Sequence, residues 1–168
     1  MIPIQIVGYK NSGKTTFSCQ LIAALKERKI QVASLKHHGH GGVPLGFENT
    51  DSEKHLAAGA VVSGVEGAGV LQLSLSQSIW DIEKILTFYQ LMEVELVVIE
   101  GFKQQHFGKV VLIREEEDLD LLKQLSNVVA VVSMVAIEQS EQYQVFETSD
   151  AAINWIMHNL HLFAKHEE

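Results

Sequence analysis

Short apolar runs alternate with amphipathic segments along the chain, and this alternation sets the predicted fold. Apolar runs predict strands at residues 2–7, 31–35, 95–101, 109–113 and 127–133. Helical spacing predicts helices from Lys14 to about Arg28 and over residues 51–60, 79–92 and 149–163. Strands that alternate with helices in this way are typical of an α/β fold, with helices on both faces of a mostly parallel sheet.

Several segments add detail to this three-layer arrangement. Two β-rich runs within residues 60–75 flank Gly64, Gly67 and Gly69, which predicts an added antiparallel β-hairpin at a sheet edge. Ile79, Ile82, Ile85, Leu86 and Tyr89 are expected on the buried side of their helix. Thr50 or Asp51 is expected to cap the helix at 51–60, and Ser149 or Asp150 the last helix. The segment 36–50 is predicted to be an exposed, mobile loop.

Length and charge limit the function classes. A chain of 168 residues without internal repeats predicts a single domain over residues 1–168. The net charge of -8 and the absence of a basic block argue against a nucleic-acid or anionic-membrane surface. The longest apolar run, residues 128–137, has about half the length needed to cross a bilayer. Cys19 is the only cysteine, which suits a reducing cytoplasm.

The stretch GYKNSGKTT follows the first strand and contains the complete pattern G-x-x-x-x-G-K-[ST] of a phosphate-binding P-loop. Glycines let the backbone turn sharply, so that successive N–H groups surround phosphates at a helix N-terminus. Lys14 is expected to reach the β- and γ-phosphates, and the Thr15 hydroxyl to coordinate Mg²⁺. The predicted phosphate-binding residues are Gly8, Asn11, Ser12, Gly13, Lys14, Thr15 and Thr16.

A metal-bound triphosphate also needs a carboxylate at the end of a neighbouring buried strand. Glu100 ends the strand ELVVIEG and has this position, so it is predicted to hold Mg²⁺ and to orient water. Gly101 would let the backbone approach the γ-phosphate. Asp51 is a second candidate for both roles, and its alternative is a helix cap.

The segment KHHGH combines Lys36 with His37, His38 and His40, and two interpretations stay open. It can be a transition-metal site, although such sites need about four ligands and the cysteine is distant. It can instead be a switch loop whose Lys and His side chains contact phosphates or an anionic substrate. Lys103 and His106 would then extend the same positive rim, or lie in a solvated loop.

Taken together, GYKNSGKTT, KHHGH, TDSEKHLAAGA and ELVVIEGFK resemble the MobB family of molybdopterin-guanine dinucleotide biosynthesis adaptor proteins, up to about Ile113. The resemblance implies a P-loop GTPase fold, GTP and Mg²⁺ as ligands, and a homodimer for which the hairpin is the candidate interface. It further implies molybdopterin and a MobA-type nucleotidyltransferase as partners. Residues 12–16 would hold phosphates, Thr15 and Glu100 the metal, and Asp51 the switch. Lys36, His37 and Lys103 would face the pterin or phosphate side.

One departure concerns the base. Regulatory GTPases read guanine with an N-K-x-D segment after a late strand, and here Ser133 and Met134 stand at that strand's end. Guanine preference is therefore implied by the family alone. Arg28 and Arg114 are interpreted as solvated element ends, so slow intrinsic GTP hydrolysis is expected. The alternatives are a small-molecule kinase, although an arginine-rich lid is missing, a metallochaperone GTPase, and an adaptor whose nucleotide only orders the fold.

Overall fold

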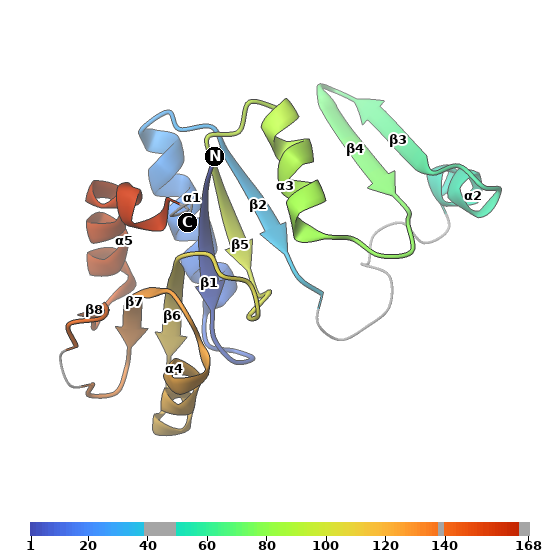
Figure 1. Ribbon diagram of the computed structural model, residues 1–168. Helices are drawn as coiled ribbons and strands as arrows, with labels where there is room; N and C mark the ends of the chain where they lie inside the picture. The colour runs from blue at the N-terminus through green and yellow to red at the C-terminus, as the bar shows by residue number, and fades with distance from the viewer. Residues whose placement is uncertain (39–49, 138–139, 165–168) are drawn as a thin grey trace. The chain divides into compact units, whose positions relative to one another are not determined.

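The computed structural model describes residues 1–38, 50–137 and 140–164 (Figure 1). These residues divide into two compact units, one formed by residues 1–37 and 89–168 and the other by residues 38–88. His40, part of the predicted histidine cluster, lies outside the described residues, as does most of the predicted loop 36–50. The expectation of one domain over the whole chain stays a prediction.

The first unit is built on a six-stranded sheet in the order β2-β5-β1-β6-β7-β8. Every pair of neighbouring strands in it is parallel. The strands are β1 (Ile2–Val7), β2 (Val32–Lys36), β5 (Leu96–Glu100), β6 (Lys109–Ile113), β7 (Val128–Ser133) and β8 (Gln144–Phe146). All five predicted strands are thus confirmed within one or two residues. β8 was not predicted from the sequence.

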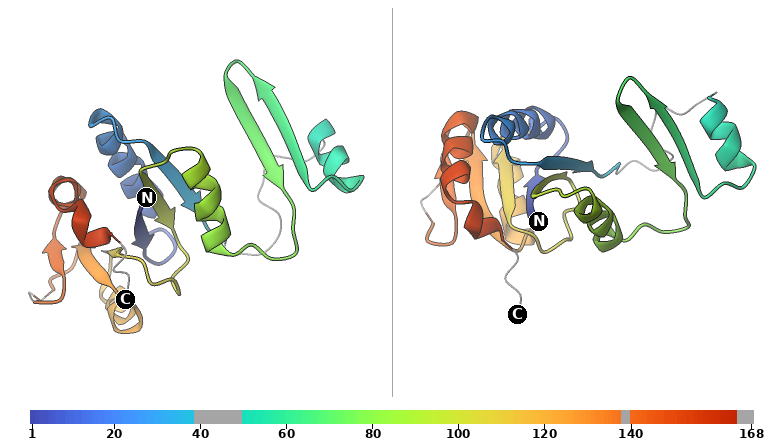
Figure 2. Two further views of the ribbon diagram at one scale, coloured as in Figure 1. Left: turned by 45° about the horizontal axis from the view of Figure 1, so that its top comes forward. Right: turned by 90° about the horizontal axis from the view of Figure 1, so that it is seen from above.

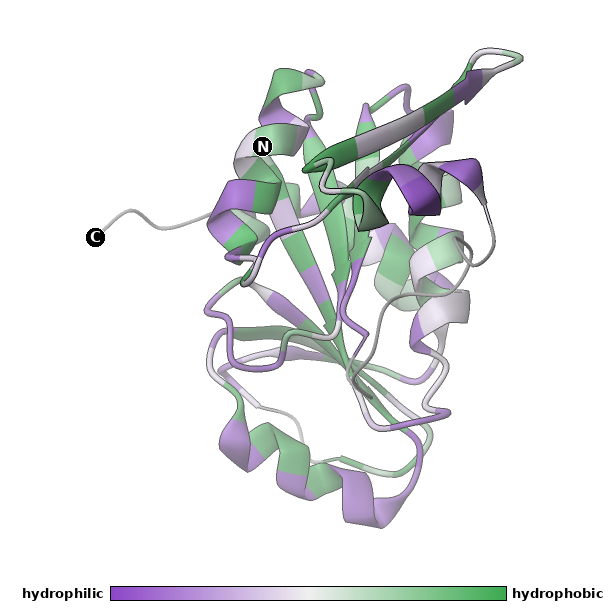
Figure 3. Cartoon of the chain, turned by 90° about the vertical axis from the view of Figure 1, so that its right-hand side faces the viewer, coloured by the Kyte–Doolittle hydropathy of each residue, from purple (hydrophilic) through white to green (hydrophobic). Residues whose placement is uncertain are grey.

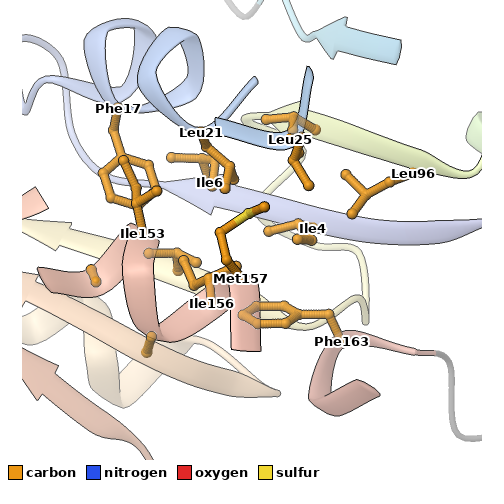
Figure 4. Packing of buried hydrophobic residues seen from close by; sticks show 14 of the residues in the cluster. Ile4, Ile6, Phe17, Leu21, Leu25, Leu96, Ile153, Ile156, Met157 and Phe163 are labelled. Atoms are coloured by element: carbon orange, nitrogen blue, oxygen red, sulfur yellow. The ribbon is translucent and has the colours of Figure 1, made fainter. Parts of the chain in front are cut away.

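Helices pack against both faces of this sheet. α1 (Lys14–Glu27) and α5 (Ser149–His158) lie side by side over one face, where the main hydrophobic core is formed (Figures 2 and 4). That core includes Ile4, Leu21 and Ile156, none of which is exposed. A smaller cluster on the other face joins the sheet to the 3-10 helix Glu116–Leu119 and to α4 (Asp120–Gln124). The predicted α/β class is confirmed.

The second unit contains α2 (Asp51–Ala57), the hairpin of β3 (Val62–Gly67) and β4 (Val70–Leu75), and most of α3 (Ile82–Leu91), which continues into the first unit. The antiparallel hairpin is confirmed, with a turn at Ala68 and Gly69, both of which have positive φ. Its placement at a sheet edge was wrong. β3 and β4 form a two-stranded sheet of their own, because they pair only with each other within the described part of the chain.

Helix ends agree with the prediction at the start of α2 and differ from it at α5 and α3. Thr50 caps α2, and its side chain accepts from the Glu53 N–H. Thr148 caps α5 in the same way, in place of the predicted Ser149 or Asp150. α5 ends at His158, and residues up to Phe163 form the separate 3-10 helix Leu160–Phe163. α3 begins only at Ile82, so Ile79 is exposed rather than buried.

Candidate functional site

The predicted phosphate loop joins the end of β1 to the start of α1. Gly13 is the residue before α1 and has a φ of 91°, which glycine adopts without strain. Because glycine has no side chain, no side-chain hydrogen bond caps this 14-residue helix, and the N–H groups of its first turn can face a ligand in the loop. Gly8 is needed for close packing, since an added Cβ would lie 2.3 Å from Ser12 Oγ. The loop therefore has the backbone form that phosphate binding requires.

The Lys14 ammonium lies inside this loop. Its Nζ donates to the Tyr9 carbonyl oxygen at 2.6 Å. Desolvation lowers the pKa of Lys14, while the nearby Glu100 carboxylate acts in the opposite direction. Lys103 and Lys36 also lower this pKa, which shows that several cations gather here although the chain is acidic overall. Such a cluster favours a polyanionic ligand.

Thr15 and Glu100 meet directly, although 85 residues separate them in the sequence. Parallel pairing of β1 with β5 brings the end of β5 beside the loop, with Ile6 opposite Glu100. The Thr15 hydroxyl lies 3.0 Å from Glu100 Oε2 and 3.2 Å from Oε1. The Lys36 ammonium contacts both groups, at 3.1 Å from Thr15 Oγ1 and 2.8 Å from Glu100 Oε1. The structure thus brings together three of the predicted site residues.

Gly101 and His37 surround the backbone of Glu100. The His37 N–H donates to the Glu100 carbonyl oxygen at 2.9 Å. Gly101 has a φ of 93°, and an added Cβ would lie 3.1 Å from the His37 Cβ. The His37 ring packs against Phe102 with ring centroids 4.6 Å apart. Gly101 is therefore required here by its backbone angle and by this close approach.

Two buried polar side chains hold the segment 101–108 that follows Glu100. The Gln5 amide in β1 donates to the carbonyl oxygens of Gly101 and Phe102 at 2.7 and 2.6 Å. The Lys109 ammonium at the start of β6 donates to the carbonyl oxygens of Gln105 and Phe107. Gln5 and Lys109 are opposite each other in register. One pair of adjacent residues in the sheet therefore fixes both ends of the segment beside the site.

Sequence reasoning missed Gln5, Lys109 and Arg114. Arg114 directly follows β6, and its guanidinium donates to the Asn11 carbonyl oxygen of the phosphate loop at 3.0 Å. It supports the loop and is not simply a solvated strand end. The signals were present: Gln5 interrupts the apolar run IPIQIV, and Lys109 opens the buried run KVVLI. Arg114, like Glu100, is a charged residue at the carboxyl end of a buried strand.

Lys103 joins the site and His106 does not. The Lys103 ammonium lies 4.2 Å from the centroid of the Tyr9 ring, in a cation–π contact within the loop region. His106 instead contacts the Ser126 hydroxyl at 3.2 Å, just before β7. Because this is the amino end of a parallel strand, His106 lies at the opposite edge of the sheet from the phosphate loop. The predicted positive rim therefore includes only the first of these two residues.

Asp51 and the histidine cluster are the remaining residues with a predicted metal role. Asp51 begins α2 in the second unit, where its carboxylate contacts Lys54 at 2.8 Å. Its predicted roles toward metal and water stay predictions. Within the described parts of the chain, no three His, Cys, Asp or Glu side chains are grouped so as to hold a metal ion. The metal interpretation of His37, His38 and His40 gains no support from the part of that cluster that is described.

The residues of the site fit a magnesium-bound triphosphate. Two neighbouring ligands of an octahedral Mg²⁺ at about 2.1 Å are about 3.0 Å apart, and Thr15 Oγ1 and Glu100 Oε2 have that separation. Ser12 Oγ is buried and has no hydrogen-bond partner in the described structure, so it is available to a ligand oxygen. Backbone N–H groups at a helix N-terminus, a partly desolvated lysine and a hydroxyl–carboxylate pair are the groups that phosphates and Mg²⁺ require.

Fold and loop together define an α/β protein with a fold like that of the P-loop NTPases. Residues 3–134 match the family model described as molybdopterin guanine dinucleotide synthesis protein B. Since this match covers more than half of the chain, the protein belongs to the MobB family.

Individual relatives agree with this assignment. A curated protein of Bacillus subtilis (strain 168), called a probable molybdopterin-guanine dinucleotide biosynthesis adapter protein, is 39% identical over 94% of this chain and 92% of its own length. The crystal structure of Bacillus subtilis MobB is similar with a TM-score of 0.79 and 34% identity, over 99% of this chain and 100% of that one. A MobB homologue from Bacillus stearothermophilus has a TM-score of 0.77 and 35% identity, over 96% and 99%.

Among the described helices, none is both long enough and apolar enough to cross a membrane.

Proposed function

We propose that this protein is a GTP-binding adapter of molybdenum cofactor biosynthesis, which assists a MobA-type nucleotidyltransferase in attaching GMP to molybdopterin. The observation that carries the proposal is the contact of Thr15 with Glu100 beside Lys14, in a chain of the MobB family. Relatives named as adapters in molybdopterin-guanine dinucleotide biosynthesis support the pathway. The single, exposed Cys19 suits a cytoplasmic location.

In this proposal the loop residues bind the phosphates and Lys14 neutralises their charge. Thr15 and Glu100 would hold Mg²⁺, which supplies charge neutralisation when it is bound. Lys36, His37 and Lys103 lie at the same edge and would face phosphate or pterin groups. Asp51, at the start of α2, would serve as the switch next to the metal, as the family resemblance implies.

Guanine preference and slow hydrolysis are part of the same proposal. At the end of β7, Ser133 Oγ is occupied with the backbone of Val135, at 2.7 Å from its carbonyl oxygen. The base would therefore be read by backbone groups rather than by a carboxylate at this position. Arg114 already supports the Asn11 carbonyl, so its guanidinium is not free to stabilise a transition state without leaving the loop. Slow turnover follows from that arrangement.

A reconstituted reaction tests the proposal. The purified nucleotidyltransferase, molybdopterin and Mg²⁺-GTP are incubated with and without this protein, and molybdopterin guanine dinucleotide is quantified by chromatography. We expect a higher initial rate or yield with the protein present. Calorimetry of this protein alone is expected to show tighter binding of Mg²⁺-GTP than of Mg²⁺-ATP. An unchanged yield with an active nucleotidyltransferase and a folded, GTP-binding protein would contradict the adapter role.

We further propose that the hairpin of β3 and β4 joins two copies of the chain. The alternation of the strands places Val62, Leu71, Leu73 and Leu75 on one face of the hairpin. Leu71 and Val70 are 59% and 67% exposed, and hydrophobic residues recur along both strands (Figure 3). Among the residues that the structure describes, β3 and β4 pair only with each other, which leaves their outer edges available to another strand. A second copy can add strands at these edges and cover the leucine face.

Sedimentation velocity tests the dimer. Wild type is expected to sediment as a dimer, whereas the double variant Leu71→Asp, Leu73→Asp is expected to be monomeric because it places charge on the leucine face. Gln72→Asp is the control, since it adds one negative charge to the neighbouring position on the other face. A monomeric wild type at tens of micromolar, or a leucine-face variant that stays dimeric, would contradict this interface.

A further inference from the structure

The pairing of β2 with β5 places a lysine ammonium in the predicted metal site. β2 pairs with β5, and the last residues of the two strands, Lys36 and Glu100, are opposite each other. The next residue, His37, continues the pairing through its N–H to the Glu100 carbonyl oxygen. The contact between the Lys36 ammonium and the Glu100 carboxylate is therefore a consequence of sheet pairing, and it does not depend on a chance approach of two surface side chains.

The Lys36 ammonium contacts the same hydroxyl and the same carboxylate that a metal ion would use. It contacts Glu100 Oε1 at 2.8 Å and Thr15 Oγ1 at 3.1 Å, while these two oxygens are 3.2 Å apart. The three polar groups thus form a closed triangle. The Glu100 side chain is only 12% exposed, whereas that of Lys36 is 61% exposed. The carboxylate is held in place and the ammonium is free to move on its flexible stem.

Mg²⁺ cannot share these oxygens with the ammonium without strong repulsion. A Mg²⁺ ion bound to Thr15 and Glu100 would lie about 2.1 Å from each ligand oxygen. An ammonium on the same hydroxyl and the same carboxylate would then lie only a few ångströms from a divalent cation, in a partly desolvated site where charges interact strongly. We propose that Lys36 and Mg²⁺ are alternative cations for Thr15 and Glu100, and that Mg²⁺ displaces Lys36 when it binds.

This exchange makes Lys36 a positioning residue for the metal site. It neutralises and orients Glu100 before the metal binds, and it weakens binding of the metal alone. Once displaced, its ammonium stays near the loop, where it can contact a phosphate. Binding of the metal together with nucleotide is then favoured over binding of the metal alone. The inference rests on the proposed Mg²⁺-nucleotide site and names the residue that regulates the metal affinity of that site.

Titration with Mn²⁺ in place of Mg²⁺, followed by electron paramagnetic resonance of the free ion, tests the exchange on the full chain without nucleotide. Lys36→Met is expected to bind Mn²⁺ about three- to tenfold more tightly than wild type, the factor expected from removing one competing, partly buried ion pair. Lys36→Arg keeps the charge and is expected to stay near wild type. Lys26→Met, which removes an exposed charge at the far end of α1, is expected to leave the affinity unchanged.

Two further measurements separate this inference from the proposed function. Glu100→Gln is expected to abolish the loss of the free-Mn²⁺ signal on adding protein, which places the bound ion at this site. Equal or weaker Mn²⁺ binding by Lys36→Met, or no binding by either protein at millimolar Mn²⁺, overturns the exchange. GTP binding, measured by calorimetry in the same proteins, tests the proposed function independently. A wild type that binds Mn²⁺ but no GTP contradicts the proposed function and leaves the cation exchange supported.

Discussion

Replacing Lys14 with alanine is expected to weaken binding of Mg²⁺-GTP by about tenfold to a hundredfold, the loss expected for one charge-assisted contact to phosphate. The Lys14 ammonium is directed into the phosphate loop by its 2.6 Å contact with the Tyr9 carbonyl oxygen. Desolvation lowers its pKa, so its charge is costly until a phosphate compensates it. A phosphate therefore gains more from this lysine than from a solvated one. Isothermal calorimetry measures the change.

The matched control is Lys10→Ala, which removes the same charge from an exposed position of the same loop. If the contribution of Lys14 comes from direct contact, the control is expected to lower the affinity by less than about threefold, the size of a screened long-range effect. Hydrolysis gives a second readout in the same proteins. A Lys14→Ala protein that binds or hydrolyses GTP like wild type would remove the loop from the proposed site.

Strands that are buried on both faces could be predicted well from the sequence. β1 and β6 have the predicted bounds, because a continuous apolar run ends where a glycine or a charged residue follows it. β8 was missed because it has only three residues, begins with Gln144 and is held by pairing with β7. Neither its length nor its composition distinguishes it from a loop. Pairing between distant segments, which makes it a strand, leaves no local pattern.

The hairpin shows a different limit. Its turn and its alternation could be predicted, since both depend on residues close in sequence. Whether it joins a larger sheet depends on partners elsewhere, and the structure shows β3 and β4 paired only with each other in the described chain. The capping residues illustrate the same point on a smaller scale. Thr50 was one of two candidates for the cap of α2, and Thr148 caps α5 one position before the predicted Ser149, a difference that helical periodicity cannot resolve.

The same limit separates the site residues that could be predicted from the sequence from those that could not. The phosphate loop and Glu100 could be found because a contiguous motif and a strand end mark them. Gln5 and Arg114 act through carbonyl oxygens of other segments, at Gly101, Phe102 and Asn11, and no motif marks such contacts. A polar residue inside an apolar strand is the one general signal for them, because burial without a hydrogen-bond partner is costly.

Lys109 is the most extreme such residue, and it leads to a prediction about pH. Its side chain has no exposed surface and donates to the carbonyl oxygens of Gln105 and Phe107. Burial lowers the pKa of Lys109 from its ordinary 10.5 to about 8. Between these values the unfolded chain binds more protons than the folded one, so the free energy of unfolding rises with pH. Below pH 8 both states carry the charge, and the folded state bears the full cost of burying it.

The stability of wild type relative to Lys109→Met is therefore expected to increase by about 2.5 kcal/mol between pH 7 and pH 10. This is most of the full effect of about 3.4 kcal/mol, which is a pKa difference of roughly 2.5 units at about 1.36 kcal/mol each, because pH 10 is still below 10.5. Urea unfolding at a series of pH values measures it, and taking the difference cancels the groups that titrate alike in both proteins. Lys26→Met, the same substitution at an exposed position, is expected to run parallel to wild type. If Lys109→Met also runs parallel, Lys109 is solvated in the folded protein, and the segment 101–108 beside Glu100 is then held by Gln5 without a charged partner.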